Sequence, residues 1–189
     1  IHFHNNSTTS SADGAAVFID DNATVTIDRC KFTSNTSYNS NSSNGSAIGT
    51  EGTMTVKNSL FYDNTCAYGT NAAYSGHVFV RTASSNGVTS FINCTFTENN
   101  AGNPVSMYDA DGGTVTFQNC LFHNNTASDD VVEKYCSSTY PQMNNCYYDG
   151  RSGSFNTSSE SGNLTSGTID FMGASNDDFR IGYNSVCRD

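Results

Sequence analysis

The sequence repeats the pattern Phe-x-x-Asn at nearly constant spacing, and this repeat constrains the fold more than any other feature. Five copies are present, at Phe3–Asn6, Phe32–Asn35, Phe61–Asn64, Phe96–Asn99 and Phe122–Asn125. Successive phenylalanines are 29, 29, 35 and 26 residues apart, and Tyr148 follows the last of them by 26 residues. A period of roughly 20 to 30 residues that tolerates insertions is typical of a solenoid, in which each repeat forms one coil. The spacing therefore predicts an all-β solenoid of about six coils.

The residues that lead to each phenylalanine are expected to form strands. In the aligned segments 24–32, 53–61, 88–96 and 114–122, β-branched and aromatic residues alternate with polar ones. This period of two buries one face of a strand. Stacked coils then carry four inward rows: Val25, Met54, Thr89 and Val115; Ile27, Val56, Phe91 and Phe117; Cys30, Ser59, Cys94, Cys120 and Cys146; and Phe3, Phe32, Phe61, Phe96 and Phe122. The residues between them are expected to face water, namely Thr26, Thr55, Ser90 and Thr116.

The repeated asparagine has a structural explanation. A β-helix turns sharply between strands, and an inward Asn satisfies backbone groups in that turn while its amide bonds to the Asn of the next coil. We expect one such ladder, formed by Asn6, Asn35, Asn64, Asn99 and Asn125. These residues are therefore predicted to be structural and not part of a ligand site.

Length and charge limit the class of protein. The 189 residues fit a single domain, with repeats in 1–150 and a tail in 151–189 that is expected to cap the C-terminal end. The chain has 8 basic and 18 acidic residues, a net charge of −10, which argues against nucleic-acid partners and anionic membranes. No apolar run approaches the roughly 20 residues of a membrane span, and no signal peptide is recognised.

The start of the sequence corresponds to the last third of a coil. Residues 1–6 align with the end of each later repeat, so the solenoid is expected to begin with an uncapped end. Unpaired strand groups at such an end can pair with another chain, and a contact between unlike ends propagates into a filament. The expectation is head-to-tail self-association.

Asn-x-Ser/Thr sequons are frequent in this chain, as in secreted glycoproteins. Asn6 and Asn35 belong to the inward ladder and are expected to be poor acceptors, whereas Asn93 precedes an inward cysteine and should point outward. The predicted sites of N-glycans are Asn5, Asn22, Asn41, Asn44, Asn93, Asn124, Asn156 and Asn163.

The sequence contains no Cys-x-x-Cys pair that could chelate a metal ion. The cysteines therefore fit a secreted protein in an oxidising compartment better than a metal site. The seven disulfide candidates are Cys30, Cys66, Cys94, Cys120, Cys136, Cys146 and Cys187. The odd count leaves at least one thiol free or paired with another chain. Cys94, Cys120 and Cys146 would be about 4.8 Å apart on neighbouring coils. Two of them could form a bridge, or all three could be a buried stack of thiols.

Two short motifs resemble known families. The segments 14–17 (Gly-Ala-Ala-Val) and 45–48 (Gly-Ser-Ala-Ile), each followed by Phe-x-x-Asn, resemble the paired repeat of the polymorphic outer-membrane proteins. This resemblance covers about residues 1–127 and implies a right-handed parallel β-helix with a surface or adhesive role. The ending 178–189, which begins Asp-Phe-Arg-Ile, is similar to the tail of many pectin-lyase-like β-helix proteins.

The chain offers no recognisable catalytic constellation. The aspartate pairs 20–21, 129–130 and 177–178 each lie at an expected turn and do not recur on one face, although glycan-cleaving enzymes need clustered carboxylates. The segment 109–112 begins like a calcium loop but has Cys120 where the bidentate Glu is needed. The histidines (2, 4, 77 and 123) do not cluster. No metal, cofactor or catalytic residue is therefore predicted.

The favoured hypothesis is a non-enzymatic extracellular structural or adhesive glycoprotein module, with surface glycans as possible ligands. One alternative is a carbohydrate-active β-helix enzyme. Another is an ice-binding protein, because stacked Thr-x-Thr segments at 24–26, 53–55 and 114–116 resemble flat ice-binding faces.

Overall fold

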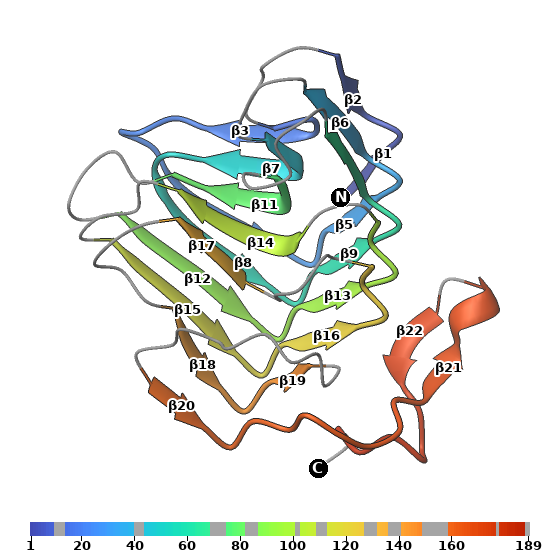
Figure 1. Cartoon of the computed structure of the whole chain (residues 1–189). Coiled ribbons are helices and arrows are strands. Elements are labelled where there is room, and N and C mark those ends of the chain that lie inside the picture. Colours follow the sequence, from blue (N-terminus) through green and yellow to red (C-terminus); the bar gives the residue numbers. More distant parts are fainter. Residues whose placement is uncertain are drawn as a thin grey trace.

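A computed structural model describes residues 1–9, 14–39, 44–68, 75–81, 87–100, 103–108, 113–126, 132–135, 141–148, 159–176 and 178–187. In these residues the chain winds into a parallel β-helix (Figure 1). Each coil passes through sheet I, then sheet II, then sheet III. The predicted all-β solenoid is therefore the fold.

The three long sheets are each built from one strand per coil. Sheet I consists of β4 (Thr24–Asp28), β8 (Thr53–Lys57), β12 (Val88–Ile92), β15 (Thr114–Gln118), β18 (Gln142–Asn144) and β20 (Ser159–Ser161). Sheet II consists of β1 (His2–His4), β5 (Lys31–Thr33), β9 (Leu60–Tyr62), β13 (Thr95–Thr97), β16 (Leu121–His123) and β19 (Tyr147–Tyr148). Sheet III consists of β3 (Val17–Ile19), β7 (Asn44–Thr50), β11 (Ser75–Val80), β14 (Asn103–Tyr108) and β17 (Val132–Tyr135).

A short sheet forms the corner between sheets II and III. It contains β2 (Ser7–Thr8), β6 (Thr36–Asn39) and β10 (Thr65–Tyr68). Within the described ranges, about four full turns separate β3 from β17. This is fewer than the predicted six coils, because the first coil has no strand in sheet I and the last contributes only short strands.

The inward rows stack in register. Parallel pairing of the sheet II strands places each phenylalanine of the repeat beside the phenylalanine of the next coil. The centroids of neighbouring rings lie 4.4–4.9 Å apart, and the ring planes are nearly parallel. The row consists of Phe3, Phe32, Phe61, Phe96 and Phe122. Four of the five are fully buried or nearly so. Stacked aromatic side chains thus occupy the interior along sheet II.

The asparagine ladder is continuous from Asn6 to Asn125. In each step, one Asn donates from Nδ2 and from its backbone N–H to Oδ1 of the Asn in the next coil, as Asn35 does to Asn64 at 2.9 and 3.1 Å. Nδ2 also donates to the carbonyl of a phenylalanine in the preceding coil, as in the 2.9 Å bond from Asn64 to Phe32. Every side-chain polar atom of an interior ladder residue is therefore paired, which explains why burial of the amide is tolerated.

Two further turn positions recur with left-handed backbone. Between sheets I and II these are Arg29, Asn58, Asn93, Asn119 and Asn145, with φ between 51° and 54°. Directly before the ladder they are Asn5, Ser34, Asp63, Glu98 and Asn124, with φ between 53° and 57°. Asn and Asp tolerate this conformation better than other non-glycine residues. The recurrence of Asn and Asp at these two positions is therefore a signal in the sequence for the two turns.

The glycine of the Gly-x-Ala motif has a steric reason. A Cβ atom on Gly14 would overlap the carbonyl oxygen of Val17, and one on Gly45 would overlap that of Ile48. The two glycines form a parallel bridge at the entrance to sheet III. Only glycine permits so close an approach of the backbone to itself.

The longest coil carries most of its extra residues between sheets III and I. Cys66 pairs with Ser37 at the ordinary offset of 29 residues. The offset is 30 where Val80 pairs with Thr50 and 35 where Thr89 pairs with Met54. Five of the six extra residues therefore lie between β11 and β12.

The outward face of sheet I is not a uniform threonine array. Thr26, Thr55, Ser90 and Thr116 are aligned as predicted, and Thr116 donates to Ser90 over 2.9 Å. The neighbouring outward row contains Val88, which pairs with Thr114 and is 41% exposed. This apolar residue interrupts the threonine row considered for ice binding.

The tail does more than cap the end of the solenoid. β20 pairs with β18, and Leu164 bridges to Tyr147, so residues 159–164 add a partial coil at the C-terminal end. The chain then returns along the outside of sheet II, where β21 (Phe171–Gly173) and β22 (Asp178–Ile181) form an antiparallel hairpin around η2 (Ala174–Asn176) (Figure 1). Phe179 is buried against Tyr62, with ring centroids 4.6 Å apart. Most of the tail is thus a lateral cover and not an end cap.

Candidate functional site

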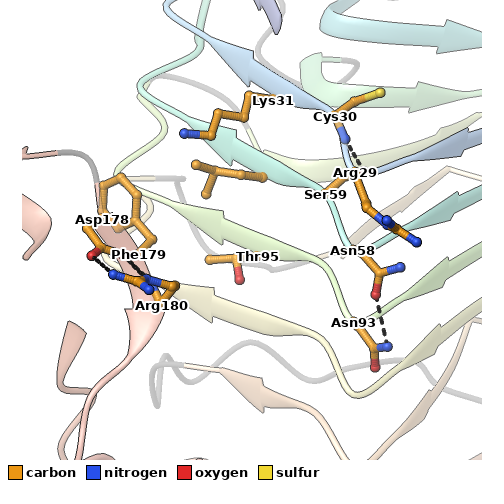
Figure 2. A pocket seen from close by; sticks show the side chains of 11 residues that line it. Arg29, Cys30, Lys31, Asn58, Ser59, Asn93, Thr95, Asp178, Phe179 and Arg180 are labelled. Atoms are coloured by element: carbon orange, nitrogen blue, oxygen red, sulfur yellow. Dashed lines mark hydrogen bonds and ion pairs between the residues drawn. The ribbon is translucent and has the colours of Figure 1, made fainter. Parts of the chain in front are cut away.

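The return of the tail creates a groove along the outer face of sheet II. The groove has a volume of about 640 Å³. In Figure 2, Asp178, Phe179 and Arg180 of the tail stand on one side, and Arg29 and Asn58 stand on the other. The full lining is Arg29, Cys30, Lys31, Asn58, Ser59, Leu60, Asn93, Thr95, Asp178, Phe179 and Arg180. We refer to it below as the lateral groove.

The lateral groove concentrates positive charge on an acidic protein. Three of the chain's eight Lys and Arg residues line it, Arg29, Lys31 and Arg180, and they face one carboxylate, that of Asp178. Among the residues that the structure describes, Arg29 makes one ion contact, an exposed one of 3.7 Å with Asp28, which contributes little energy. Lys31 forms no ion pair with any residue that the structure describes. The groove therefore has cationic groups available to an anionic ligand.

Asp178 and Arg180 form a bidentate pair on the groove wall. Nε and Nη2 of Arg180 lie 2.8 and 2.6 Å from the two carboxylate oxygens of Asp178. Hydrogen bonds donated by Arg180 lower the pKa of Asp178 to about 2, and the same contacts raise the pKa of Arg180. This pair holds the planar guanidinium in one orientation beside the groove.

The opposite wall carries an exposed ladder of polar side chains at the turn between sheets I and II. Asn58 donates to Asp28 at 2.8 Å, Asn93 to Asn58 at 3.2 Å, and Asn119 to Asn93 at 3.2 Å. This outer ladder was not predicted from the sequence, although an Asn directly before the row of inward cysteines was its signal. It presents amide groups to solvent at one position per coil.

Some predicted glycosylation sites lie at accessible turns. Asn5, Asn22, Asn93 and Asn124 are exposed, although Asn93 also borders the lateral groove, where an attached glycan would occupy the groove. Asn41 and Asn156 lie outside the described residues, as does the side chain of Asn44.

Asn163 is placed differently from the expectation of an accessible loop. Its Oδ1 accepts from the backbone N–H of Cys146 at 2.9 Å, and its Nδ2 donates to the carbonyl of Met143 at 3.0 Å. Both polar atoms of the Asn163 amide therefore form hydrogen bonds with the last coil. A glycan on Nδ2 would break the bond from Nδ2 to the carbonyl of Met143. A glycan at Asn163 therefore requires the loss of a hydrogen bond that holds the last coil.

The described cysteines are free thiols. Cys30, Cys94, Cys120 and Cys146 lie buried in the predicted inward row, and Cys66 is buried elsewhere in the interior. Cys187 is partly buried in the tail, and Cys136 lies outside the described residues. Of the two arrangements that the sequence left open, the structure contains the stack of thiols and no bridge among the six described cysteines.

One buried constellation escaped sequence reasoning. Nδ1 of His77 lies 2.9 Å from Oγ of Ser46 and 3.9 Å from Sγ of Cys66, and Ser37 hydrogen-bonds to the same sulfur. These side chains are at most 1% exposed, and burial raises the pKa of the Cys66 thiol. Residues of this kind form nucleophilic sites in enzymes, but here no substrate could reach them. They form a polar layer inside the solenoid.

The other residues considered for chemistry remain dispersed. His2 and His4 both contact Oγ1 of Thr33, at 2.7 and 2.8 Å, whereas His77 is buried against Ser46 and Cys66. Asp20 and Asp21 are exposed at a turn, whereas Asp129, Asp130, Asp177 and the segment 109–112 are outside the described residues. Among the residues that the structure places, no three His, Cys, Asp or Glu side chains are arranged to hold a metal ion.

Comparison with known proteins agrees with this architecture. Within the described parts of the chain, no helix has the length and apolar character needed to cross a membrane. Searches of curated proteins and of solved structures found no match. The family described as right-handed beta helix region matches residues 2–163. The parallel coils, the stacked interior rows and this match together show that the chain belongs to the right-handed β-helix family.

Proposed function

We propose that the protein is a non-enzymatic extracellular adhesive module, whose β-helix is a rigid support and whose lateral groove binds the anionic groups of a glycan. The observation that carries this proposal is the gathering of Arg29, Lys31 and Arg180 in one groove of a chain with net charge −10. Such a local reversal of sign attracts and retains anions that the rest of the surface repels.

The groove offers the chemistry that an acidic sugar requires. The guanidinium of Arg29 and the ammonium of Lys31 suit carboxylate or sulfate groups. Asn58, Asn93 and Thr95 provide amide and hydroxyl groups for neutral sugar hydroxyls. Asn58 and Asn93 come from successive coils about 4.8 Å apart, so an amide group recurs along the groove. A ligand with a repeating structure, such as a polysaccharide, fits this arrangement.

Isothermal titration with oligosaccharides tests the proposal. We expect uronic-acid oligosaccharides to bind and a neutral glucan of equal length to bind at least about tenfold more weakly, with affinity falling as salt is added. Lys31→Ala should weaken acidic binding about five- to tenfold, since one charge-assisted contact is lost. Lys57→Ala is the matched control, because Lys57 lies on β8 and does not line the groove.

Two results would contradict this function. Equal affinity for acidic and neutral oligosaccharides, unchanged in Lys31→Ala, would remove the groove as the binding site. Shortened products after incubation of the protein with acidic or neutral polysaccharides would favour the alternative of a carbohydrate-active enzyme.

We also propose that copies of the module associate end to end. Within the described residues, β17 and β20 are the outermost strands of sheets III and I at the C-terminal end and pair on one side only. Open strand edges of this kind are templates for pairing. Sedimentation velocity over a hundredfold range of concentration should show growing species, and a single monomeric species throughout would refute the association.

A further inference from the structure

A small pocket lies on the outer face of sheet II, at the end of the sheet that β1 forms (Figure 1). It has a volume of about 270 Å³. His2 and His4 line it from β1, and Lys31, Thr33 and Ser34 line it from the next coil. We refer to it below as the histidine pocket.

The two histidines project from the same face of β1. Residues two apart on a strand have side chains on one side of the sheet, and Phe3 between them stacks on Phe32 of the interior row at 4.8 Å. His2 and His4 therefore face outward, and both are exposed. Their ring centroids are 5.2 Å apart. No cluster of histidines was predicted from the sequence, but the alternation along β1 places these two imidazoles side by side.

Both rings direct a nitrogen at one hydroxyl group. Nε2 of His2 lies 2.7 Å from Oγ1 of Thr33, and Nδ1 of His4 lies 2.8 Å from the same atom. Parallel pairing of β1 with β5 holds Thr33 opposite His4, and Thr33 is buried. The hydroxyl has one proton and donates to only one of the rings, so the other ring donates an N–H to the oxygen. Nitrogens of two separate residues are thus held around one point.

We propose that His2 and His4 together bind a divalent late transition metal ion of the zinc class. Imidazole nitrogen is a ligand that these ions prefer, and zinc bonds to it at about 2.0–2.1 Å. In a neutral imidazole the proton can reside on either nitrogen. When it resides on the nitrogen remote from Thr33 in both rings, two lone pairs face the same point. The metal ion then lies between the rings, with water at its remaining positions.

The groups around the histidine pocket select this class of ion. Calcium and magnesium require several oxygen ligands, commonly carboxylates, and none of the described Asp and Glu residues lines the pocket. Two protein ligands make a reversible site that is weaker than a structural site with four. Lys31 also lines the pocket, and its charge opposes a cation. Its ammonium group points toward the tail in Figure 2, where its charge acts on Asp178.

Isothermal titration of the full chain with zinc(II) tests the site. We expect one ion to bind at the pair. His2→Ala and His4→Ala should each weaken binding at least about tenfold, since even the loss of an outer-shell partner commonly costs that much. His123→Ala is the matched control, because His123 is on β16 of the same sheet, packs against Phe171 and does not line the pocket. It should leave the zinc affinity unchanged.

The stoichiometry separates a chelating pair from two independent histidines. Independent sites would take up two ions, and each substitution would remove one ion without changing the affinity for the other. That result would overturn the proposal, and so would an affinity that stays the same in both His2→Ala and His4→Ala.

NMR of the imidazole rings in the unmodified chain keeps the proposal falsifiable even if the variants do not fold. Zinc should shift the ring resonances of His2 and His4 together and leave those of His123 in place. Shifts confined to His123, or no shift of any ring, would contradict the site. Glycan binding is measured separately, because His2 and His4 do not line the lateral groove.

Discussion

Nδ2 of Asn64 donates a 2.9 Å hydrogen bond to Oδ1 of Asn99, across a coil of 35 residues. The preceding step of the ladder, from Asn35 to Asn64, spans 29 residues and has the same length of 2.9 Å. The additional residues are therefore excluded from the ladder turn. The geometry of this turn is kept while the loop between sheets III and I absorbs the change in length.

Asn99→Ala should lower the free energy of unfolding by about 2 to 3 kcal/mol, since buried backbone and amide groups lose their partners. Asn99 is fully buried, and its side chain bonds to Asn64, to the carbonyl of Phe61 and to Asn125. Urea denaturation followed by circular dichroism measures the effect. The control is Gln118→Ala, which removes an exposed amide on β15 and should change stability by less than about 0.5 kcal/mol. Equal midpoints for the two variants would show that the ladder adds little.

Phe96→Ala should cost about 3 to 5 kcal/mol, as expected for a buried aromatic side chain that leaves a cavity. Its ring stacks between Phe61 at 4.4 Å and Phe122 at 4.9 Å and meets the edge of Phe91 at 5.7 Å. The same denaturation experiment applies. Phe18→Ala is the comparison, because Phe18 is 48% exposed and should cost far less. If both substitutions had the same effect, the stacked row would not be the main source of core stability.

The carboxyl group of Asp178 should titrate near pH 2. Its pKa in the folded protein is about 2, below the ordinary value of 3.8, because Arg180 donates hydrogen bonds to the carboxylate. A lowered pKa means that the pair supports the folded tail above about pH 4 and that this support is lost as the pH falls from 4 to 2. Carbon-detected NMR titration measures the midpoint. Arg180→Gln should raise it by about one pH unit or more, whereas Lys31→Ala should raise it less, since Lys31 acts only through its charge. A midpoint near 3.8 in the unmodified protein would argue against the bidentate pair.

Glycan occupancy should differ between Asn124 and Asn163. Asn124 is exposed at a turn, whereas the amide of Asn163 is bonded to the backbone of Cys146 and Met143. When the chain is produced in a secretory host that attaches N-glycans, Asn124→Gln should remove the mass of one glycan and Asn163→Gln should remove none. Intact-mass spectrometry before and after enzymatic deglycosylation gives the count. A glycan found on Asn163 would mean that the last coil differs from the one described.

The periodic part of the fold could be predicted from the residues alone. Within each repeat, apolar residues such as Val25 and Ile27 alternate with polar ones, and the equivalent residues recur in later repeats. A shift of the strand register by one residue would therefore move these apolar side chains to solvent. Asn64 likewise has one favourable place, because a buried amide needs partners on both sides. These constraints act within one coil or between adjacent coils, where the repeat itself specifies which residues meet.

The candidate site could not be predicted in the same way. Arg180 belongs to a tail without a repeat, and it lines one groove with Arg29 and Lys31 because Phe179 packs against Tyr62 on the outside of sheet II. No local periodicity relates these segments, which are about 120 to 150 residues apart in the chain. The inward turn of Asn163 depends on the same return of the tail.

The sequence by itself determined the coils, their register and the stacked rows, because each repeat must bury the same apolar face against its neighbours. The tertiary structure decided where the tail lies and that the cations form a groove. These features arise from single contacts between distant segments, and their energies depend on shape and burial that only the folded chain defines.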